Sequence, residues 1–371
     1  MPPRRGISAR VVILKIHLYL GIAAAIVLLV LSLSGAFIAW EHDIERWVHP
    51  RLWYTTASHT MLPESEVIRI AERAFAPARA TNVQIDRRRN VVRVLQMSDK
   101  SSVYISQWDG AIHGRIVGTS RTQRLIGYIH QLHLRLVPDP ASAPRNLSTI
   151  GKLVVSFAGL FLCFLVPTGW ILWWRTRRAP IRWSGSWFRI AFDAHRTIGI
   201  YVSLFLLVAG FTGIMVGFDF AEEQLYAITR SEHPKRPPSP PSGDAAGRSP
   251  IDVDHAIASA IAVFPGDGVA QVKLPSTGRA SYTVFVRTPG DPSPDAPILA
   301  NVYVDQYSGK VIRVDNFLGE SPGYRMVRLN RAIHTGDLMG LFGHILMSFT
   351  SVMLGLMVIS GLVIWLKKLA I

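Results

Sequence analysis

The chain has 371 residues, 49% of them hydrophobic, and a formal net charge of +15 at pH 7. This apolar content is too high for an ordinary soluble domain when the apolar residues cluster, as they do here. The basic residues form no compact motif with interleaved aromatic residues, so nothing indicates a nucleic-acid partner. The single cysteine, Cys163, excludes an intrachain disulfide, a cysteine-rich metal site and covalent haem attachment through C-x-x-C-H.

Four apolar runs reach the length that a helix needs to cross a bilayer. They cover residues 18–40, 153–174, 197–218 and 341–366. We expect the first run to be retained, because it exceeds the apolar core of a signal peptide and no A-x-A-like site follows it. The sequence therefore predicts a membrane protein, mainly α, whose four transmembrane helices form a bundle in the lipid bilayer.

Arginine and lysine flank the runs on one side of the predicted membrane. Excess positive charge is typical of cytoplasmic segments, whereas long translocated loops are largely exempt from this bias. We therefore expect a multi-pass protein with both termini in the cytoplasm and both long loops outside. The basic residues concerned are Arg4, Arg5, Arg10, Lys15, Arg175, Arg177, Arg178, Arg182, Arg189, Lys367 and Lys368.

Each long loop combines a helical pattern with alternating strands. Acidic residues open the helical stretches 63–75 and 251–264, and the turn dipeptides Asp109-Gly110 and Ser308-Gly309 each interrupt an alternating strand pattern. These patterns predict two outer α+β domains. The predicted order is a first transmembrane helix (1–40), outer domain 1 (41–145), a second transmembrane helix (146–175), a cytoplasmic loop (176–194), a third transmembrane helix (195–218), outer domain 2 (219–333) with a flexible Pro-rich linker (233–250), and a fourth transmembrane helix (334–371).

The two halves of the chain match each other. Aligning His17 with His195 also aligns glycines in the first and third apolar runs, and glycines eighteen residues apart recur in the second and fourth runs. Both halves begin on the cytoplasmic side, so we predict a parallel internal repeat with its axis along the membrane normal. The aligned glycine pairs are Gly21 with Gly199, Gly35 with Gly213, Gly151 with Gly343, and Gly169 with Gly361.

The repeat predicts a common role for His17 and His195. Each lies at the start of an apolar run, and a twofold axis would place them on opposite sides of the bundle at one depth. Two facing imidazoles are the axial ligands that a b-type haem requires. Gly21 and Gly199, one turn later, would leave room for a flat macrocycle. We expect these histidines to bind haem iron.

A second pair is expected at the outer side, where an amphipathic stretch with a histidine precedes each later run. His133 and His334 are the natural repeat pair. His344 is the main competitor, since it lies at the outer mouth of the fourth helix, and His130 is one turn from His133 and could replace it or orient a propionate. Two b haems would thus lie at two depths.

The surroundings of these histidines suggest electron transfer across the membrane. The neighbouring basic residues Lys15, Arg135, Arg196 and Arg331 could pair with haem propionates or simply anchor the interface. No P-loop, dinucleotide fingerprint or hydrolase triad occurs in the sequence, and no catalytic residue is assigned. Electrons would therefore arrive from a quinol or a cytoplasmic reductase and leave to an acceptor outside.

Several phrases taken together resemble one family. "K-x-H-x-x-x-G" and "SG" in the first helix, "LHLRL", "PTGWILWW", "HRTIG" and "IHTG" resemble the PepSY-associated transmembrane-helix family, and the outer segments resemble PepSY domains. Family members commonly carry an acidic residue before the outer histidine, where this chain has Gln131 and Leu132. The linker 233–250 also departs from the family pattern.

This resemblance implies an iron-regulated protein of the Gram-negative inner membrane with periplasmic PepSY-like domains. Its best-understood relatives are di-haem reductases that release iron from ferric siderophores. It further implies two haem b groups, a ferric siderophore as partner and haem-iron ligation by His17, His133, His195 and His334.

Three other functions are compatible with parts of the pattern. The outer domains could bind or regulate a protease without redox chemistry, although such a function needs no paired intramembrane histidines. A permease is disfavoured, because no acidic residue lies in the middle of an apolar run. The haems could also reduce a partner protein instead of an iron chelate.

Overall fold

The computed structural model describes residues 8–369 except 59, 138, 140–142, 175–180, 234–237, 267, 290–298 and 317–320. Five of the basic residues used above to orient the chain lie outside the described residues. These are Arg4, Arg5, Arg175, Arg177 and Arg178.

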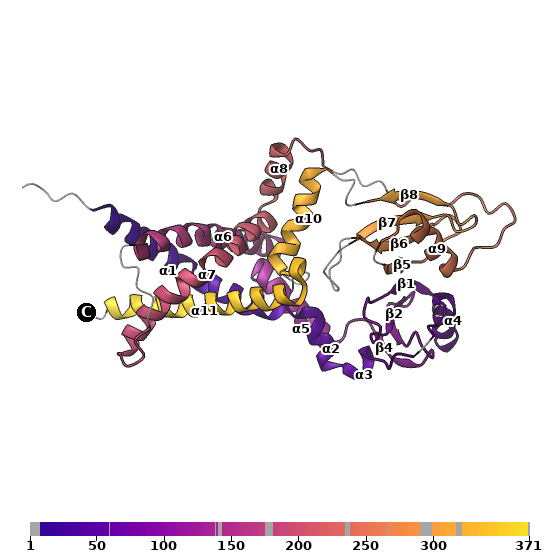
Figure 1. Cartoon of the computed structure of the whole chain (residues 1–371), viewed down its shortest axis with the longest axis horizontal. Helices are drawn as coiled ribbons and strands as arrows, with labels where there is room; N and C mark the ends of the chain where they lie inside the picture. Colours follow the sequence, from indigo (N-terminus) through magenta and orange to yellow (C-terminus); the bar gives the residue numbers. More distant parts are fainter. Residues whose placement is uncertain are drawn as a thin grey trace, which may run out of the picture.

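Four long helices confirm the predicted membrane spans. Each is long and apolar enough to cross a bilayer, and each begins before its apolar run. α1 contacts α6 and α11, and α7 contacts the same two helices, so the four close into a bundle (Figure 1). Their bounds are α1 (Ala9–Ile38), α6 (Arg145–Trp174), α7 (Trp187–Gly217) and α11 (Gly340–Leu369).

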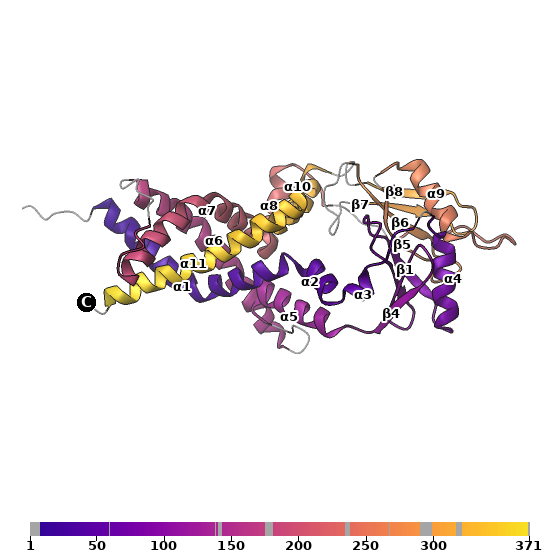
Figure 2. The ribbon, with the colours of Figure 1, turned by 60° about the horizontal axis from the view of Figure 1, so that its bottom comes forward.

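The strands of the described residues form one antiparallel sheet of eight, which lies beyond one end of the bundle (Figures 1 and 2). Its spatial order is β4-β3-β2-β1-β5-β6-β7-β8, so each half of the chain contributes four neighbouring strands. The strands are β1 (Ala80–Gln84), β2 (Arg93–Met97), β3 (Ser101–Ile105), β4 (Ile112–Val117), β5 (Val269–Lys273), β6 (Tyr282–Arg287), β7 (Leu299–Val304) and β8 (Val311–Asp315).

The two outer segments meet at strands β1 and β5, where Val83 pairs with Val272. An exposed strand edge leaves a row of backbone groups unpaired, and joining two edges satisfies both. Two helices that contact each other, α4 (Glu64–Ala74) and α9 (Val253–Val263), pack against the sheet. The segments therefore share one sheet, a pairing that the local sequence pattern did not predict.

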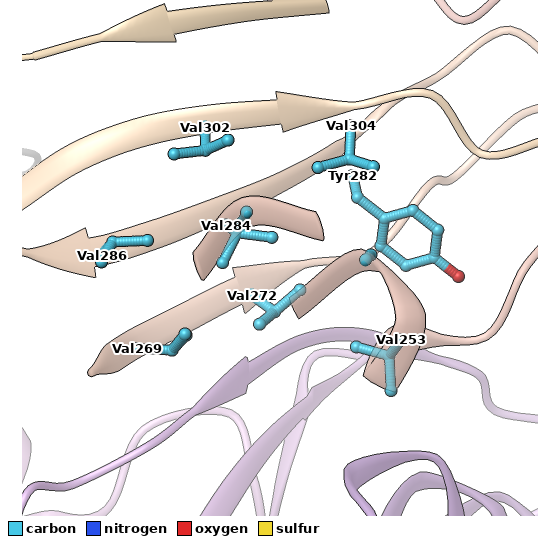
Figure 3. Packing of buried hydrophobic residues seen from close by; sticks show 10 residues of the cluster. Val253, Val269, Val272, Tyr282, Val284, Val286, Val302 and Val304 are labelled. Atoms are coloured by element: carbon cyan, nitrogen blue, oxygen red, sulfur yellow. The ribbon is translucent and has the colours of Figure 1, made fainter. Parts of the chain in front are cut away.

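Valines dominate the core beneath α9. Val272, Val284, Val286, Val302 and Val304 are fully buried between the helix and strands β5–β7 (Figure 3). A matching cluster lies under α4, and partly buried side chains such as Ile68 pack against both clusters. Burial of this kind stabilises by about 1.5–3 kcal/mol per large side chain, so the sheet and its two helices form one hydrophobic unit.

The predicted turns are present in both halves. Gly110 and Gly309 lie between the strands of the hairpins β3–β4 and β7–β8, with φ values of 72° and 70°. A left-handed conformation of this kind favours glycine, which explains the turn dipeptides.

Part of the stretch expected to be a flexible linker is bonded to the sheet. The Gly243 amide donates to Asp305, and the Ser242 hydroxyl donates to the carbonyl of Ala280. The described part of the segment therefore packs against the second outer unit. This differs from the flexible linker that the composition predicts.

Amphipathic helices join the sheet to the bundle. In the first half these are α2 (Glu41–Val48), α3 (Pro50–Trp53) and α5 (Arg121–Arg135); in the second they are α8 (Asp219–Ile228) and α10 (Pro322–Thr335). A short 3-10 turn, η2 (Asp337–Met339), leads from α10 into α11.

Two aligned glycines let α5 and α10 dock on the bundle. A Cβ on Gly151 would lie 1.7 Å from the carbonyl oxygen of Arg135, and one on Gly343 would lie 1.9 Å from that of Gly336. Any other residue would separate the end of the outer helix from the start of the next membrane span. The close approach thereby positions the histidines of α5 and α10 above the bundle.

Candidate functional site: two histidine pairs

The structure brings four of the five predicted site histidines together in two pairs. His17 of α1 faces His195 of α7, with ring centroids 6.4 Å apart and ring planes at 89°. His133 of α5 faces His334 of α10, again with centroids 6.4 Å apart, and with planes at 56°. We call these the inner and outer pairs. In each pair one histidine comes from each half of the chain.

A side-chain hydroxyl lies against the Nδ1 atom of every paired histidine. In the inner pair, Thr168 Oγ1 is 2.9 Å from His17 Nδ1, and Ser360 Oγ is 3.1 Å from His195 Nδ1. The carbonyl oxygen of Met357 is also 3.0 Å from His195 Nδ1.

The outer pair has the same arrangement. Ser34 Oγ lies 2.9 Å from His133 Nδ1, and Thr212 Oγ1 lies 2.8 Å from His334 Nδ1. These hydroxyls come from α1 and α7, the helices that also carry the inner histidines.

These hydroxyls determine where each imidazole carries its proton. All four donate their own proton to a carbonyl four residues earlier in the same helix, at 2.6 to 2.8 Å. Each hydroxyl oxygen can then only accept from the imidazole, so Nδ1 carries the hydrogen. The neutral tautomer with a free lone pair on Nε2 follows, which is the form that binds a metal.

A glycine lies beside each paired ring. A Cβ on Gly35 would be 3.1 Å from His133 Cε1, and one on Gly361 would be 3.3 Å from His195 Cε1. Gly169 and Gly213 stand in the same relation to His17 and His334, each at 3.5 Å. The Cε1 atom of each ring therefore lies against a glycine of a neighbouring helix, most tightly at Gly35 and Gly361.

The glycines expected to make room for a macrocycle lie elsewhere. Gly21 faces Leu165, and Gly199 faces Met357 across the bundle. The ring contacts belong instead to Gly35, Gly169, Gly213 and Gly361.

The pairs fit a metal held by two opposite imidazoles. With nitrogen–metal bonds of about 2 Å, rings on opposite sides of one metal would have centroids about 6 Å apart. No group of three or more His, Cys, Asp or Glu side chains that could hold a metal ion occurs among the described residues. Two protein ligands per site suit haem iron, because the macrocycle supplies the other four.

The environment of the outer pair keeps its imidazoles neutral. Burial lowers the pKa of His133 to about 3, and the neighbouring His334 and His130 lower it further in the same direction. Burial also lowers the pKa of His334 below the ordinary value. Neutral imidazoles retain the lone pair that metal binding needs.

The two competing histidines have partners of their own. His344 is buried, its Nε2 lies 2.7 Å from Asp337 Oδ1, and its ring packs edge-on against Trp40. His130 Nδ1 lies 2.8 Å from Glu41 Oε2. These acidic partners distinguish His344 and His130 from His133 and His334, whose rings face each other.

A surface cavity of about 360 Å³, open to solvent, lies on α5 one turn from His133. Its lining includes His130, one turn before His133 on α5, and side chains of α2. The polar lining residues are Glu41, His42, Glu45, Gln123, His130 and Gln131.

Two of the four predicted basic neighbours have protein partners. Arg135 donates from Nη1 to Ser148 Oγ at 3.2 Å, and Arg196 Nη2 lies 3.5 Å from Asp193 Oδ1. Lys15 and Arg331 are exposed. Arg331 is one turn before His334 and lowers the pKa of Glu41 as one of several charges, with burial acting in the opposite direction.

Comparison with known families agrees with this architecture. The family model described as the PepSY-associated TM region matches residues 14–368, nearly the whole chain. The chain belongs to this family. No curated protein is similar in sequence to this member of the PepSY-associated family.

Sequence reasoning missed the hydroxyl groups that bind Nδ1. Each directly precedes one of the aligned glycines, so a hydroxyl-glycine dipeptide occurs once in each membrane helix. The four dipeptides are Ser34-Gly35, Thr168-Gly169, Thr212-Gly213 and Ser360-Gly361. This repeated dipeptide is the sequence pattern from which the hydroxyl groups could have been predicted.

Proposed function

We propose that this PepSY-associated protein is a b-type haem reductase of the bacterial inner membrane, passing electrons across the membrane to a periplasmic acceptor. The observation that carries the proposal is the two histidine pairs, each with centroids 6.4 Å apart and with every Nδ1 hydrogen-bonded to a hydroxyl group outside the pair. Two such pairs suit two haem b groups. A duplicated origin of the two halves would explain their correspondence.

The residues have distinct roles in this proposal. His17 and His195 hold the inner haem iron, and His133 and His334 hold the outer one. The Ser and Thr hydroxyls orient the imidazoles and keep Nε2 deprotonated, and the apolar helices exclude water from the inner pair. Haem, when bound, supplies one-electron oxidation and reduction at potentials that these ligands and their hydrogen bonds tune.

The spacing of the pairs supports transfer across the membrane. Gly35, against His133, is eighteen residues beyond His17 on α1. At about 1.5 Å per residue the two sites are about 27 Å apart along the helix, close to the thickness of the hydrocarbon core. The positive charge flanking the inner pair favours the cytoplasmic side for it, where a quinol or a cytoplasmic reductase would donate electrons.

A ferric siderophore is the proposed acceptor. One electron per iron reduces Fe(III) to Fe(II), which hard oxygen ligands bind less tightly, so the chelate releases it. The cavity on α5 is within the size range of small-molecule sites and lies one turn from His133. Its carboxylate, amide and imidazole groups would contact the chelate.

The deciding experiment is an absorption spectrum of the full-length protein in detergent, oxidised and dithionite-reduced, with pyridine-haemochrome quantification. We expect about two b haems per chain. The variants His17→Ala and His334→Ala should each lose one. His344→Ala is the matched control and should retain both. A chain that stays colourless after expression with ample haem would contradict the proposal.

A binding function of the outer sheet is the alternative. Strand β4 is at the sheet edge, and its Val117 is 71% exposed, which would allow a peptide of a protease or another partner to add as a further strand. This function requires no haem. A colourless chain that binds such a peptide would support it.

A further inference from the structure

A buried carboxylate with three arginines lies at the end of the bundle near the inner pair. Asp193 of α7 is fully buried. Its oxygens are 3.3 to 3.5 Å from guanidinium nitrogens of Arg182, Arg189 and Arg196. One negative charge therefore faces three positive charges, and the cluster carries an excess of two.

One arginine of this cluster retains an unused donor. The buried Nε atom of Arg196 has no hydrogen-bond acceptor within the described part of the chain, whereas Arg189 Nε lies 3.3 Å from Asp193 Oδ2. Leaving a buried charged donor without an acceptor is costly, so such a cluster favours an added anion. The side chains of Arg182 and Arg189 are 58% and 41% exposed, so an anion can reach them from outside the bundle.

The position of the cluster indicates the kind of anion. Trp183 and Trp187 flank it and are 75% and 84% exposed. Exposed tryptophans next to the end of a membrane span are typical of the headgroup region, where their rings contact both lipid and water. Arginines at that depth meet lipid phosphates before they meet bulk solvent.

We propose that Arg182, Arg189 and Arg196, organised by Asp193, form a binding site for the phosphate of an anionic phospholipid. Arg182 and Arg189 contact the headgroup from the loop and from the first turn of α7. Arg196 lies deeper and extends the positive field inward. The corresponding position two residues before His17 is Lys15, so only one half of the chain builds this site. The site does not depend on haem.

The test is native mass spectrometry of the full-length chain released from neutral detergent. The sample contains phosphatidylglycerol and phosphatidylcholine with identical acyl chains at equal concentrations. The wild type should retain phosphatidylglycerol preferentially. A Lys or Arg near the membrane surface contributes about fivefold to anionic-lipid binding, so R182Q/R189Q should lower this preference about 25-fold.

The control variant is R325Q/R328Q, which makes the same change in net charge at two exposed arginines of α10. It should leave the preference unchanged. Equal preference in R182Q/R189Q and wild type would overturn the proposal, as would a wild type that does not distinguish the two lipids. An acidic protein surface would then be the better partner. Displacement of the lipid by millimolar glycerol phosphate would instead assign the cluster to a soluble anion.

Failure here is distinguishable from failure of the haem proposal. Lipid retention is measured by mass and haem content by absorbance, and the two arginines that are changed lie outside the histidine pairs. A chain that binds haem without lipid preference refutes only the lipid site, and the reverse result refutes only the haem sites.

Discussion

The two glycines that contact the outer histidine pair leave different amounts of space beside the rings. Gly35 and Gly213 occupy corresponding positions against His133 and His334, but they differ in clearance. A Cβ on Gly35 would meet His133 Cε1 at 3.1 Å and Ser351 Oγ at 3.2 Å, whereas one on Gly213 would meet His334 Cε1 at 3.5 Å. The first contact is tighter than an ordinary van der Waals contact, and the second is not.

We therefore expect Gly35→Ala to lower the free energy of unfolding and Gly213→Ala to raise it. Replacing a helical glycine by alanine stabilises by about 1 kcal/mol through helix propensity. At position 213 little opposes this gain. At position 35 overpacking costs about 1–3 kcal/mol, because the added Cβ would crowd both the His133 ring and the Ser351 hydroxyl. Gly35→Ala should thus be about 1–3 kcal/mol less stable than Gly213→Ala.

Thermal unfolding in one detergent, at fixed protein concentration, compares the two variants directly. Haem content per chain provides a second readout, and it should fall in Gly35→Ala while remaining at the wild-type level in Gly213→Ala. If both variants unfold at the same temperature and hold the same haem, the difference in clearance has no consequence and the ring-packing argument is wrong.

Three further predictions follow from other parts of the molecule. Burial raises the pKa of Asp305, but hydrogen bonds from Ser308, Gly243 and Tyr307 outweigh it and lower the pKa to about 2. Asp305 should therefore stabilise the fold by about 2 kcal/mol above pH 4, and this contribution should be lost as the pH falls from 4 towards 2. Denaturant unfolding across this range should give free energies of unfolding for wild type and Asp305→Asn that converge at low pH. Asp254→Ala removes the carboxylate that accepts the Glu64 and Ser65 amides, so it should cost about 1–2 kcal/mol in the same assay. Ser34→Ala should keep the fold, measured by circular dichroism, but weaken haem retention about 10–100-fold because His133 loses its Nδ1 partner.

Local patterns predicted several parts of the structure. Hydropathy located the four membrane helices, because a bilayer imposes a length on any span. The turn dipeptides located the hairpins, because a left-handed φ at Gly110 and Gly309 is a local requirement. Internal alignment selected four histidines that the structure brings together in pairs. Their ligation of iron stays a prediction.

Other features depend on contacts between distant segments. The pairing of β1 with β5 joins Val83 to Val272, and neither strand pattern specifies its partner. The separation of His344 from the outer pair likewise depends on Asp337, whose carboxylate holds the imidazole. The linker prediction failed at Ser242 and Gly243 for the same reason, because composition shows low hydrophobicity but not the hydrogen bonds that the sheet offers.

Helices α1 and α7 determine the separation of the two pairs. Each carries an inner histidine and, eighteen residues later, the glycine that packs against an outer histidine. The loops contribute nothing to this distance, since it is a fixed number of helical turns on both sides of the bundle. An inserted residue between His17 and Gly35 would rotate the outer contact by about 100° and break it, so the helix itself enforces the register. A constant separation is what electron transfer between two fixed cofactors would require, and the fold provides it with its most rigid elements.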